Sequence, residues 1–115
     1  TQKMVDEAMR EFQQAQRSAH LGKRAQLYMG RCLAAKNLLD LAVEQYQAAL
    51  ADKERLTGTE RKDGLYDLAT VYEQKGDHDG ALVALKELFS IDVNYRDVGE
   101  RLESYYGEGK NAEPS

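Results

Sequence analysis

Histidine and cysteine, the side chains used most often for metal binding and nucleophilic catalysis, are scarce in this sequence. It contains two histidines, His20 and His78, and one cysteine, Cys32. No paired cysteines, H-E-x-x-H run or mixed Cys/His spacing suggests a zinc site. We expect both histidines to lie exposed at turns. Cys32 sits between Met29 and Leu33, so it is predicted to be a buried thiol with no disulfide partner in the chain.

Acidic residues offer the next candidates for chemistry. The run Asp77-His78-Asp79-Gly80 superficially resembles a calcium loop. It lacks the third ligand before the glycine and the later glutamate, so the start of a helix explains it better. Glu100 and Glu103 fit the solvated side of a helix rather than an acid–base pair. No glycine-rich phosphate loop is present. The sequence therefore predicts a non-enzyme with no cofactor and no metal.

Composition and charge narrow the classes of partner. Hydrophobic residues make up 42% of the chain and charged residues 31%, as in an ordinary folded protein. Residues 1–36 hold seven Lys/Arg against three Asp/Glu, and the rest hold nine against seventeen, which gives the net charge of −4. The acidic remainder disfavours nucleic acid as a partner. No apolar window reaches membrane-spanning length and no signal peptide is evident, so the cytoplasm is the default expectation.

The elements that must position any site are predicted to be helices. Proline occurs once, at Pro114, and alanine and leucine dominate the apolar residues, which recur at helical spacing. A left-handed stop residue or a capping residue separates successive apolar stretches. These signals are Asn37, Gly76 with Asp77, Thr57 with Glu60, and Asn94 with Asp97. The predicted helices are 3–18, 22–35, 39–56, 60–75, 78–90 and 95–106, and residues 107–115 are predicted to form a flexible tail.

A repeat underlies this pattern. Ala8 to Ala42, Leu68 to Leu102 and Tyr72 to Tyr106 are each 34 residues apart, whereas Ala42 to Ala81 is 39. The five extra residues fall between Ala51 and Arg61, where we expect a longer helix and a looser turn. The stretch Gln26-x2-Met29-Gly30-x2-Leu33, followed by Ala42-x3-Tyr46, recurs as Leu65-x2-Leu68-Ala69-x2-Tyr72, followed by Ala81-x3-Leu85.

These residues resemble the tetratricopeptide repeat family, whose period is 34 and whose signature runs W-x2-L-G-x2-Y…A-x3-F…P. The resemblance covers about residues 4 to 106, although the opening Trp is missing and Val93 or Glu54 replaces the closing Pro. It implies an all-α fold of about six helices, with antiparallel helix-turn-helix repeats stacked as a short right-handed α-solenoid. Residues 1–106 would form this domain, with a half repeat at 3–18, full repeats at 22–56 and 60–90, and a closing helix at 95–106. The segment 91–98 resembles the run before the closing helix of many bacterial members, which hints at a bacterial source.

The first helix corresponds to the second member of a repeat. Because repeats bury their faces only against neighbours, Val5, Met9 and Phe12 are expected to lack part of their cover. One expectation is that the chain is the C-terminal piece of a longer array. The other is that these apolar residues contact a second copy of the chain, as a homodimer.

The resemblance also implies a concave groove, lined by the first helix of each repeat, that receives a peptide or helix. Carried over position by position, its lining residues would be Arg24, Leu27, Arg31, Asp63, Tyr66, Thr70, Glu73, Asp97, Glu100 and Ser104. The carboxylate clamp of the family, Lys-x3-Asn, is replaced by Leu27-x3-Arg31 and Tyr66-x3-Thr70, which argues against recognition of a C-terminal carboxylate. Arg24 and Arg31 would suit an acidic part of a peptide, and Asp63, Glu73 and Asp97 a basic part.

Two functions from different classes remain open. The first is a protein-interaction scaffold that binds a peptide or helix in the groove. The second is a self-association module that docks through the first helix. Changes at Leu27 and Tyr66 would impair the first function, and changes at Val5, Met9 and Phe12 would impair the second.

Overall fold

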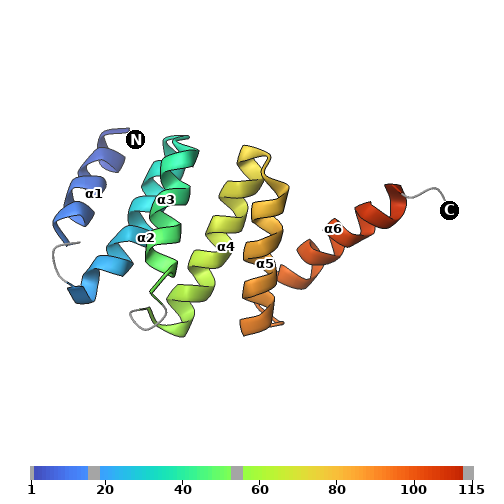
Figure 1. The fold of residues 1–115 in the computed structure, drawn as a ribbon. Coiled ribbons are helices and arrows are strands. Elements are labelled where there is room, and N and C mark those ends of the chain that lie inside the picture. Colours follow the sequence, from blue (N-terminus) through green and yellow to red (C-terminus); the bar gives the residue numbers. More distant parts are fainter. Residues whose placement is uncertain (1, 16–18, 53–55, 113–115) are drawn as a thin grey trace.

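Six helices follow one another along the chain, as the sequence predicts, and the residues described contain no strand (Figure 1). The computed structural model describes residues 2–15, 19–52 and 56–112, and at 12–15, 19–21 and 108–112 it describes the backbone alone. The helices are α1 (Gln2–Ala15), α2 (Ala19–Ala35), α3 (Leu39–Leu50), α4 (Gly58–Lys75), α5 (His78–Ile91) and α6 (Val98–Ala112). No described helix has both the length and the apolar content needed to cross a membrane.

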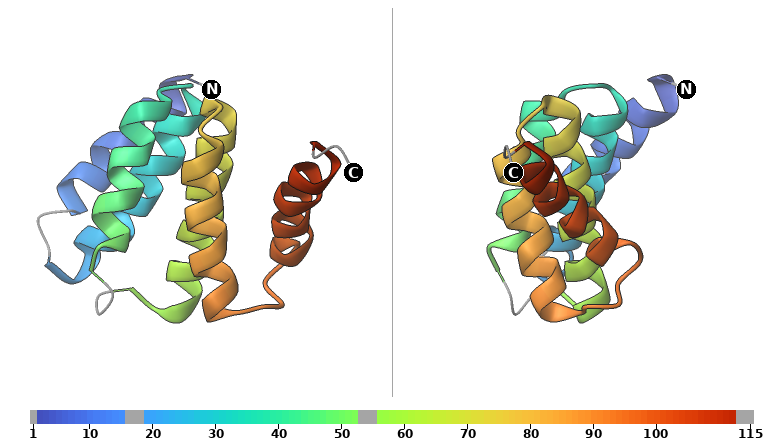
Figure 2. Two further views of the ribbon diagram at one scale, coloured as in Figure 1. Left: turned by 45° about the vertical axis from the view of Figure 1, so that its right-hand side comes forward. Right: turned by 90° about the vertical axis from the view of Figure 1, so that its right-hand side faces the viewer.

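The helices stand in a row rather than around a central core (Figure 1). Each helix packs against the next one in the chain, and α2 also contacts α4. The molecule measures 55 × 30 × 19 Å. Helix α6 starts beside α5 and diverges from it toward the C-terminus (Figures 1 and 2). Side chains on α2 and α4 are thus brought onto one surface, and α3 and α5 lie on the opposite side of the row (Figures 1 and 2).

Small residues set the close approach of neighbouring helices. Ala42, Ala69 and Ala81 are fully buried. Gly30 on α2 faces Tyr46 on α3, and a Cβ atom added at Gly30 would lie 2.9 Å from the Tyr46 ring. Tyr46 is only 1% exposed, so its ring fills the space that the missing side chain leaves. A small residue on α2 is therefore matched by a large one on α3 in this pair of helices.

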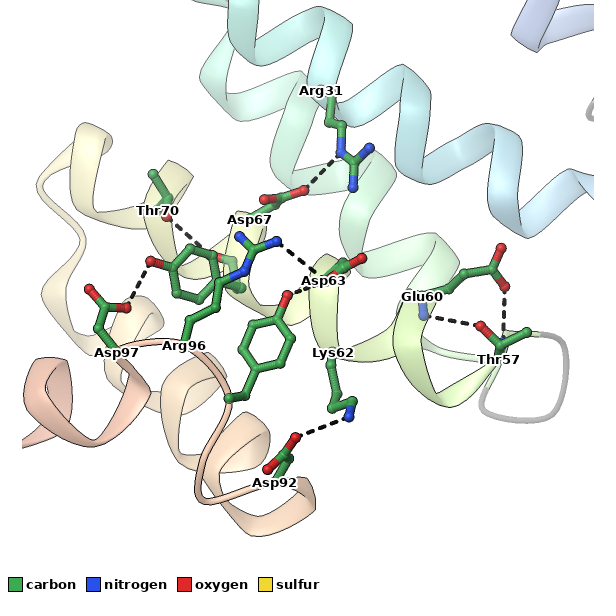
Figure 3. Close-up of polar contacts among 12 residues, drawn as sticks. Arg31, Thr57, Glu60, Lys62, Asp63, Asp67, Thr70, Asp92, Arg96 and Asp97 are labelled. Carbon is green, nitrogen blue, oxygen red and sulfur yellow. Dashed lines mark hydrogen bonds and ion pairs between the residues drawn. The ribbon is translucent and has the colours of Figure 1, made fainter.

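The stop and capping roles predicted for Asn37, Gly76, Asp77 and the pair Thr57–Glu60 are confirmed. Asn37 and Gly76 adopt left-handed φ angles of 63° and 81°. Thr57 and Glu60 form a reciprocal capping box at the start of α4 (Figure 3). The carboxylate of Asp77 accepts a hydrogen bond from the backbone N–H of Gly80 at the start of α5. Local chemistry therefore fixes both ends of α4 and the beginning of α5.

Helix α3 is shorter than predicted, because it ends at Leu50 rather than at residue 56. The guanidinium of Arg61 donates a hydrogen bond to the Leu50 carbonyl (Nη1–O 3.0 Å), so this carbonyl is satisfied where the helix ends. Leu56, outside any helix, is buried at 8% exposure. The extra residues of this repeat thus lengthen the connection and not the helix.

Helix α6 is displaced along the chain relative to the prediction. It begins at Val98 because Arg96 has a left-handed φ of 43°, which a right-handed helix does not accommodate. The helix then continues to Ala112, so residues 107–112, predicted as part of a flexible tail, are helical. Residues 95–97, predicted as the first turn of this helix, form a turn that faces α4.

Candidate interaction surface

Two ion pairs join α2 to α4. The Arg24 guanidinium donates to Glu60 (Nε–Oε2 2.5 Å), and that of Arg31 donates to Asp67 (Nε–Oδ2 2.9 Å; Figure 3). The two pairs are seven residues apart on both helices, about two helical turns, so α2 and α4 lie side by side with a constant register. The arginines remain 53% and 45% exposed. Their charges are therefore partly offset but still accessible.

An exposed tyrosine belongs to the same surface. Tyr28 on α2 is 40% exposed, and the Arg31 guanidinium carbon lies 5.2 Å from the centroid of its ring. A cation over an aromatic ring at this distance is a favourable contact. A depression of about 110 Å³ lies beside these two side chains. It is lined by Arg24, Leu27, Tyr28 and Arg31 on α2 and by Glu60 and Asp63 on α4.

A second cluster links α4 to the turn before α6. The Tyr66 hydroxyl donates to Asp97 (2.8 Å), and its ring meets that of Tyr95 edge-on, with 5.7 Å between centroids. The Tyr95 hydroxyl donates to Asp63, which also lies 3.7 Å from Arg96 (Figure 3). The Arg96 guanidinium carbon lies 4.9 Å from the Tyr66 ring centroid and 5.1 Å from that of Tyr95. The left-handed backbone of Arg96 thus places its side chain on the two tyrosines.

Helix α6 is tied to α4 by Arg101. Its guanidinium pairs with Glu73, contacts the hydroxyl of Thr70, and lies 4.8 Å from the centroid of Tyr66. The hydroxyl of Tyr105 donates to the same glutamate at 2.8 Å. We use the name α2–α4–α6 face for the surface formed by Arg24, Tyr28, Arg31, Asp63, Tyr66, Asp67, Thr70, Glu73, Tyr95, Arg96, Asp97 and Arg101.

Most of the residues predicted to line a groove lie on this face, and Leu27 lies beneath it. It is 5% exposed and packs below Gly64, whose added Cβ would lie 2.9 Å from the Leu27 Cδ2 atom. Leu27 therefore lines the depression between α2 and α4 from beneath and presents little exposed apolar surface. Glu100 and Ser104 are exposed on α6, and Ser104 lines a depression of about 160 Å³ beside Glu73.

The predicted carboxylate contacts for a basic peptide are already engaged within the chain. Asp63, Glu73 and Asp97 accept hydrogen bonds from Tyr95, Arg101 and Tyr66 respectively. These carboxylates serve to hold the turn before α6, and α6 itself, against α4.

The α1 residues predicted for self-association are only partly exposed. Val5 and Met9 are half-buried, and Met9 packs against the core. The side chain of Phe12 lies outside the described residues. The Lys36 ammonium on α2 also pairs with Asp6 on α1 (2.5 Å). Helix α1 thus directs at least part of its apolar side toward α2.

Several residues of the face were not predicted from the sequence. Glu60 and Asp67 each stand 36 residues after the arginine that they pair with. Two opposite-charge pairs with one shared offset were a usable signal, because a repeat places such residues opposite each other. Nothing comparable in the sequence indicated Tyr28 or Arg96.

Hydrogen bonds and burial on the face shift the pKa values of Glu60, Tyr66 and Tyr95. The pKa of Glu60 is lowered, first by the backbone hydrogen bond from Thr57 and also by Arg24. The pKa of Tyr66 is raised, chiefly by its hydrogen bond to Asp97, and burial raises that of Tyr95. The tyrosines are therefore neutral donors and Glu60 a charged acceptor at neutral pH.

The residues considered for chemistry lie elsewhere. Cys32 is half-buried on α2, and burial raises the pKa of its thiol, which disfavours the reactive thiolate. His78 is exposed at the start of α5, where its ring lies 6.1 Å from that of Tyr105. Within the described part of the chain, no group of three or more His, Cys, Asp or Glu side chains is arranged to hold a metal ion.

Comparison with known proteins adds no relative: no protein-family model, no curated protein and no solved structure matches this chain.

Proposed function

We propose that this chain is a tetratricopeptide-type interaction module, without catalytic activity, that binds a peptide or helix of another protein across the α2–α4–α6 face. The 34-residue spacings and the contact between Gly30 and Tyr46 support the family assignment. In such an arrangement α2, α4 and α6 are the first helices of successive units, stacked as a right-handed α-solenoid. The binding face then extends across three units.

One observation carries the proposal: tyrosine and arginine side chains gather on this face while remaining partly exposed. Tyr28 is 40% exposed, Arg31 45% and Arg96 56%. Tyrosine and arginine are the residues most enriched among energetic hot spots of interfaces. Their mutual contacts hold the side chains in place before binding, which lowers the entropy that a partner must remove.

The charges on the face indicate the kind of ligand. The carboxylates of Asp63, Glu73 and Asp97 accept internal hydrogen bonds, whereas Arg24 and Arg31 keep about half of their side chains exposed. A carboxylate of the ligand can approach these arginines from solvent with little rearrangement. We therefore expect peptides with acidic residues at the α2 side of the face and an apolar or aromatic residue near Tyr28.

Selection from a displayed library of random peptides, followed by fluorescence anisotropy with soluble copies, tests this function. Replacing Tyr28 with Ala should raise the Kd of the selected peptides about tenfold or more, as removal of a hot-spot tyrosine does. Tyr106→Ala is the matched control, because Tyr106 is also exposed (52%) but lies on α6 beside Lys86 of α5. Peptides that bind both variants as tightly as the parent chain, or a library without binders, would contradict the proposal.

A further inference from the structure

A second hollow lies on the other side of α4, away from the α2–α4–α6 face. We call it the outer groove. Helices α3 and α5 form its walls and α4 its floor, and its volume is about 430 Å³. Its apolar lining comes from Leu50, Leu65, Leu68, Val83 and Ala84. At 100° per residue, Leu65 and Leu68 project from the opposite side of α4 to Asp63 and Thr70, so the two surfaces are separate.

Contacts at both ends hold the outer groove open. At one end the Gln47 amide donates to the Tyr72 hydroxyl (2.5 Å), which joins α3 to α4. The Tyr72 ring fits there because Gly80 has no side chain, and an added Cβ would lie 2.7 Å from the ring. At the other end Arg61 bridges Leu50 on α3 and Glu87 on α5. The groove therefore needs little reorganisation to accept a ligand.

The apolar content of the groove favours side chains of a protein over a polar small molecule. Val83 lies on the wall of the groove with 67% of its surface exposed, so an apolar side chain beside the hollow is left open to solvent. A volume of about 430 Å³ lies within the range of sites that enclose a small ligand. Polar groups occur at its ends, where they contact each other, and not along the floor. Apolar side chains from a partner helix match this lining.

Charge around the groove specifies the flanks of that helix. Glu44 and Asp79 are exposed and lie within about one helical turn of Gln47 and Val83, at the Tyr72 end. The described residues give neither of these two carboxylates an ion-pair partner. The one cation that lines the groove, Arg61, is 12% exposed and paired with Glu87. The accessible charge at the Tyr72 end of the rim is thus negative, whereas Lys86, exposed three residues after Val83, adds a positive charge nearer to Glu87.

We propose that the outer groove binds a basic amphipathic helix of a partner protein, which inserts two apolar side chains, four residues apart, and places Lys or Arg beside Glu44 and Asp79. This interaction is separate from peptide binding on the α2–α4–α6 face. Burial of Val83 and of the leucine floor provides the attraction, and the carboxylates set the direction of the helix.

The test uses the full chain with labelled methyl groups and a blocked alanine-based helical peptide. This peptide carries Leu at i and i+4 with Lys on both flanks. Its addition should shift the NMR methyl signals of Leu50, Leu65 and Val83 but not that of Val93. Replacing the flanking Lys with Glu, or both Leu with Ala, should raise the Kd at least tenfold.

Variants of the chain make the location unambiguous. Val83→Arg should raise the Kd of the Leu/Lys peptide at least tenfold, whereas Val93→Arg, another exposed valine (54%), should leave it within twofold. Both positions are exposed, so both variants should fold, which circular dichroism would check. Tyr28→Ala should not alter this affinity, because Tyr28 belongs to the other face. Equal affinity for the Glu-flanked peptide, shifts confined to the α2–α4–α6 face, or no methyl shift at millimolar peptide would overturn the proposal.

Discussion

Gly30 shows how one missing side chain sets the distance between two helices. A Cβ atom there would lie 2.9 Å from two ring atoms of Tyr46, which is enclosed at 1% exposure. Alanine favours a helix over glycine by up to about 1 kcal/mol, but overpacking a closed site costs about 1–3 kcal/mol. We therefore expect Gly30→Ala to lower the free energy of unfolding by about 1 kcal/mol, measured by urea denaturation.

Gly58 provides the control for this prediction. It lies in the first turn of α4, and nothing stands within 4 Å of an added Cβ. Gly58→Ala should therefore leave stability unchanged or slightly raised. If the two variants were equally stable, steric contact with Tyr46 could not be what requires glycine at position 30.

The arginines of the α2–α4–α6 face contribute to geometry more than to stability. The Arg31–Asp67 pair is 45% and 27% exposed, and pairs of this kind contribute about 0–1 kcal/mol. Arg101 is only 15% exposed and contacts Thr70, Glu73 and Tyr66 together. Its several contacts give α6 one orientation against α4.

At the scale of single elements, α4 owes its first turn to the Thr57–Glu60 capping box. Thr57 accepts from the Glu60 N–H, and the Glu60 carboxylate accepts from the Thr57 N–H at 2.9 Å. The Arg24 guanidinium binds the same carboxylate. One side chain thus starts α4 and also connects it to α2.

This shared role predicts an acid-dependent loss of stability. The pKa of Glu60 in the folded chain is lowered from its ordinary 4.5. Its contribution to the free energy of unfolding is therefore complete above about pH 4.5 and is lost as the pH falls through the pKa of the folded chain. Glu60→Gln removes the titrating group. The free energy of unfolding of this variant should be about 1 kcal/mol lower than that of the parent chain at neutral pH, and the difference should shrink below pH 4.5.

Urea unfolding of both chains at a series of pH values measures this difference. Glu100→Gln serves as the control, because Glu100 is exposed on α6 and no carboxylate contact of the described residues involves it. A deficit of Glu60→Gln that stays constant down to pH 3 would mean that the carboxylate charge contributes nothing to the cap.

Sequence patterns predicted a helix boundary correctly where the residues that form the cap or stop are close together in the chain. Asn37, Gly76 and Thr57 act through their own backbone and near neighbours, so their types alone predict the boundaries. The end of α3 and the start of α6 depend instead on distant partners. Arg61 satisfies the carbonyl of Leu50, and the tyrosines of the face receive the side chain of Arg96.

The candidate site divides in the same way. The resemblance to the tetratricopeptide repeat put Arg24, Arg31 and Tyr66 among the predicted groove residues, and helical spacing lets Arg24 and Arg31 share one side of α2. Neither source could show that Leu27 is buried, since a residue at the border of two sides is buried or exposed according to what packs there. Because Gly64 on α4 has no side chain, Leu27 on α2 can pack closely against α4.

The whole molecule is extended. Its radius of gyration is 15.4 Å, against about 13 Å for a compact chain of this length. Contacts run mainly between neighbouring helices, so stability should vary along the row instead of being shared evenly. Three of the largest enclosed side chains, Tyr46, Leu85 and Leu88, lie on α3 and α5, the helices that pack against the two sides of α4, and the fourth, Val98, lies at the start of α6.

Hydrogen exchange in the native state should therefore be slowest in α4 and α5. Exchange should be fastest in α1 and in α6 beyond Leu102, which is the last buried residue among those described. Local opening of α1 breaks its packing against α2, and α6 beyond Leu102 contributes no buried residue among those described, whereas α4 packs against α2, α3 and α5. A protection gradient of about 2 kcal/mol or more from the centre to the ends is expected. Uniform protection would instead indicate one cooperative unit, in which the contacts between Arg101, Tyr105 and Glu73 hold α6 as firmly as the core holds α5.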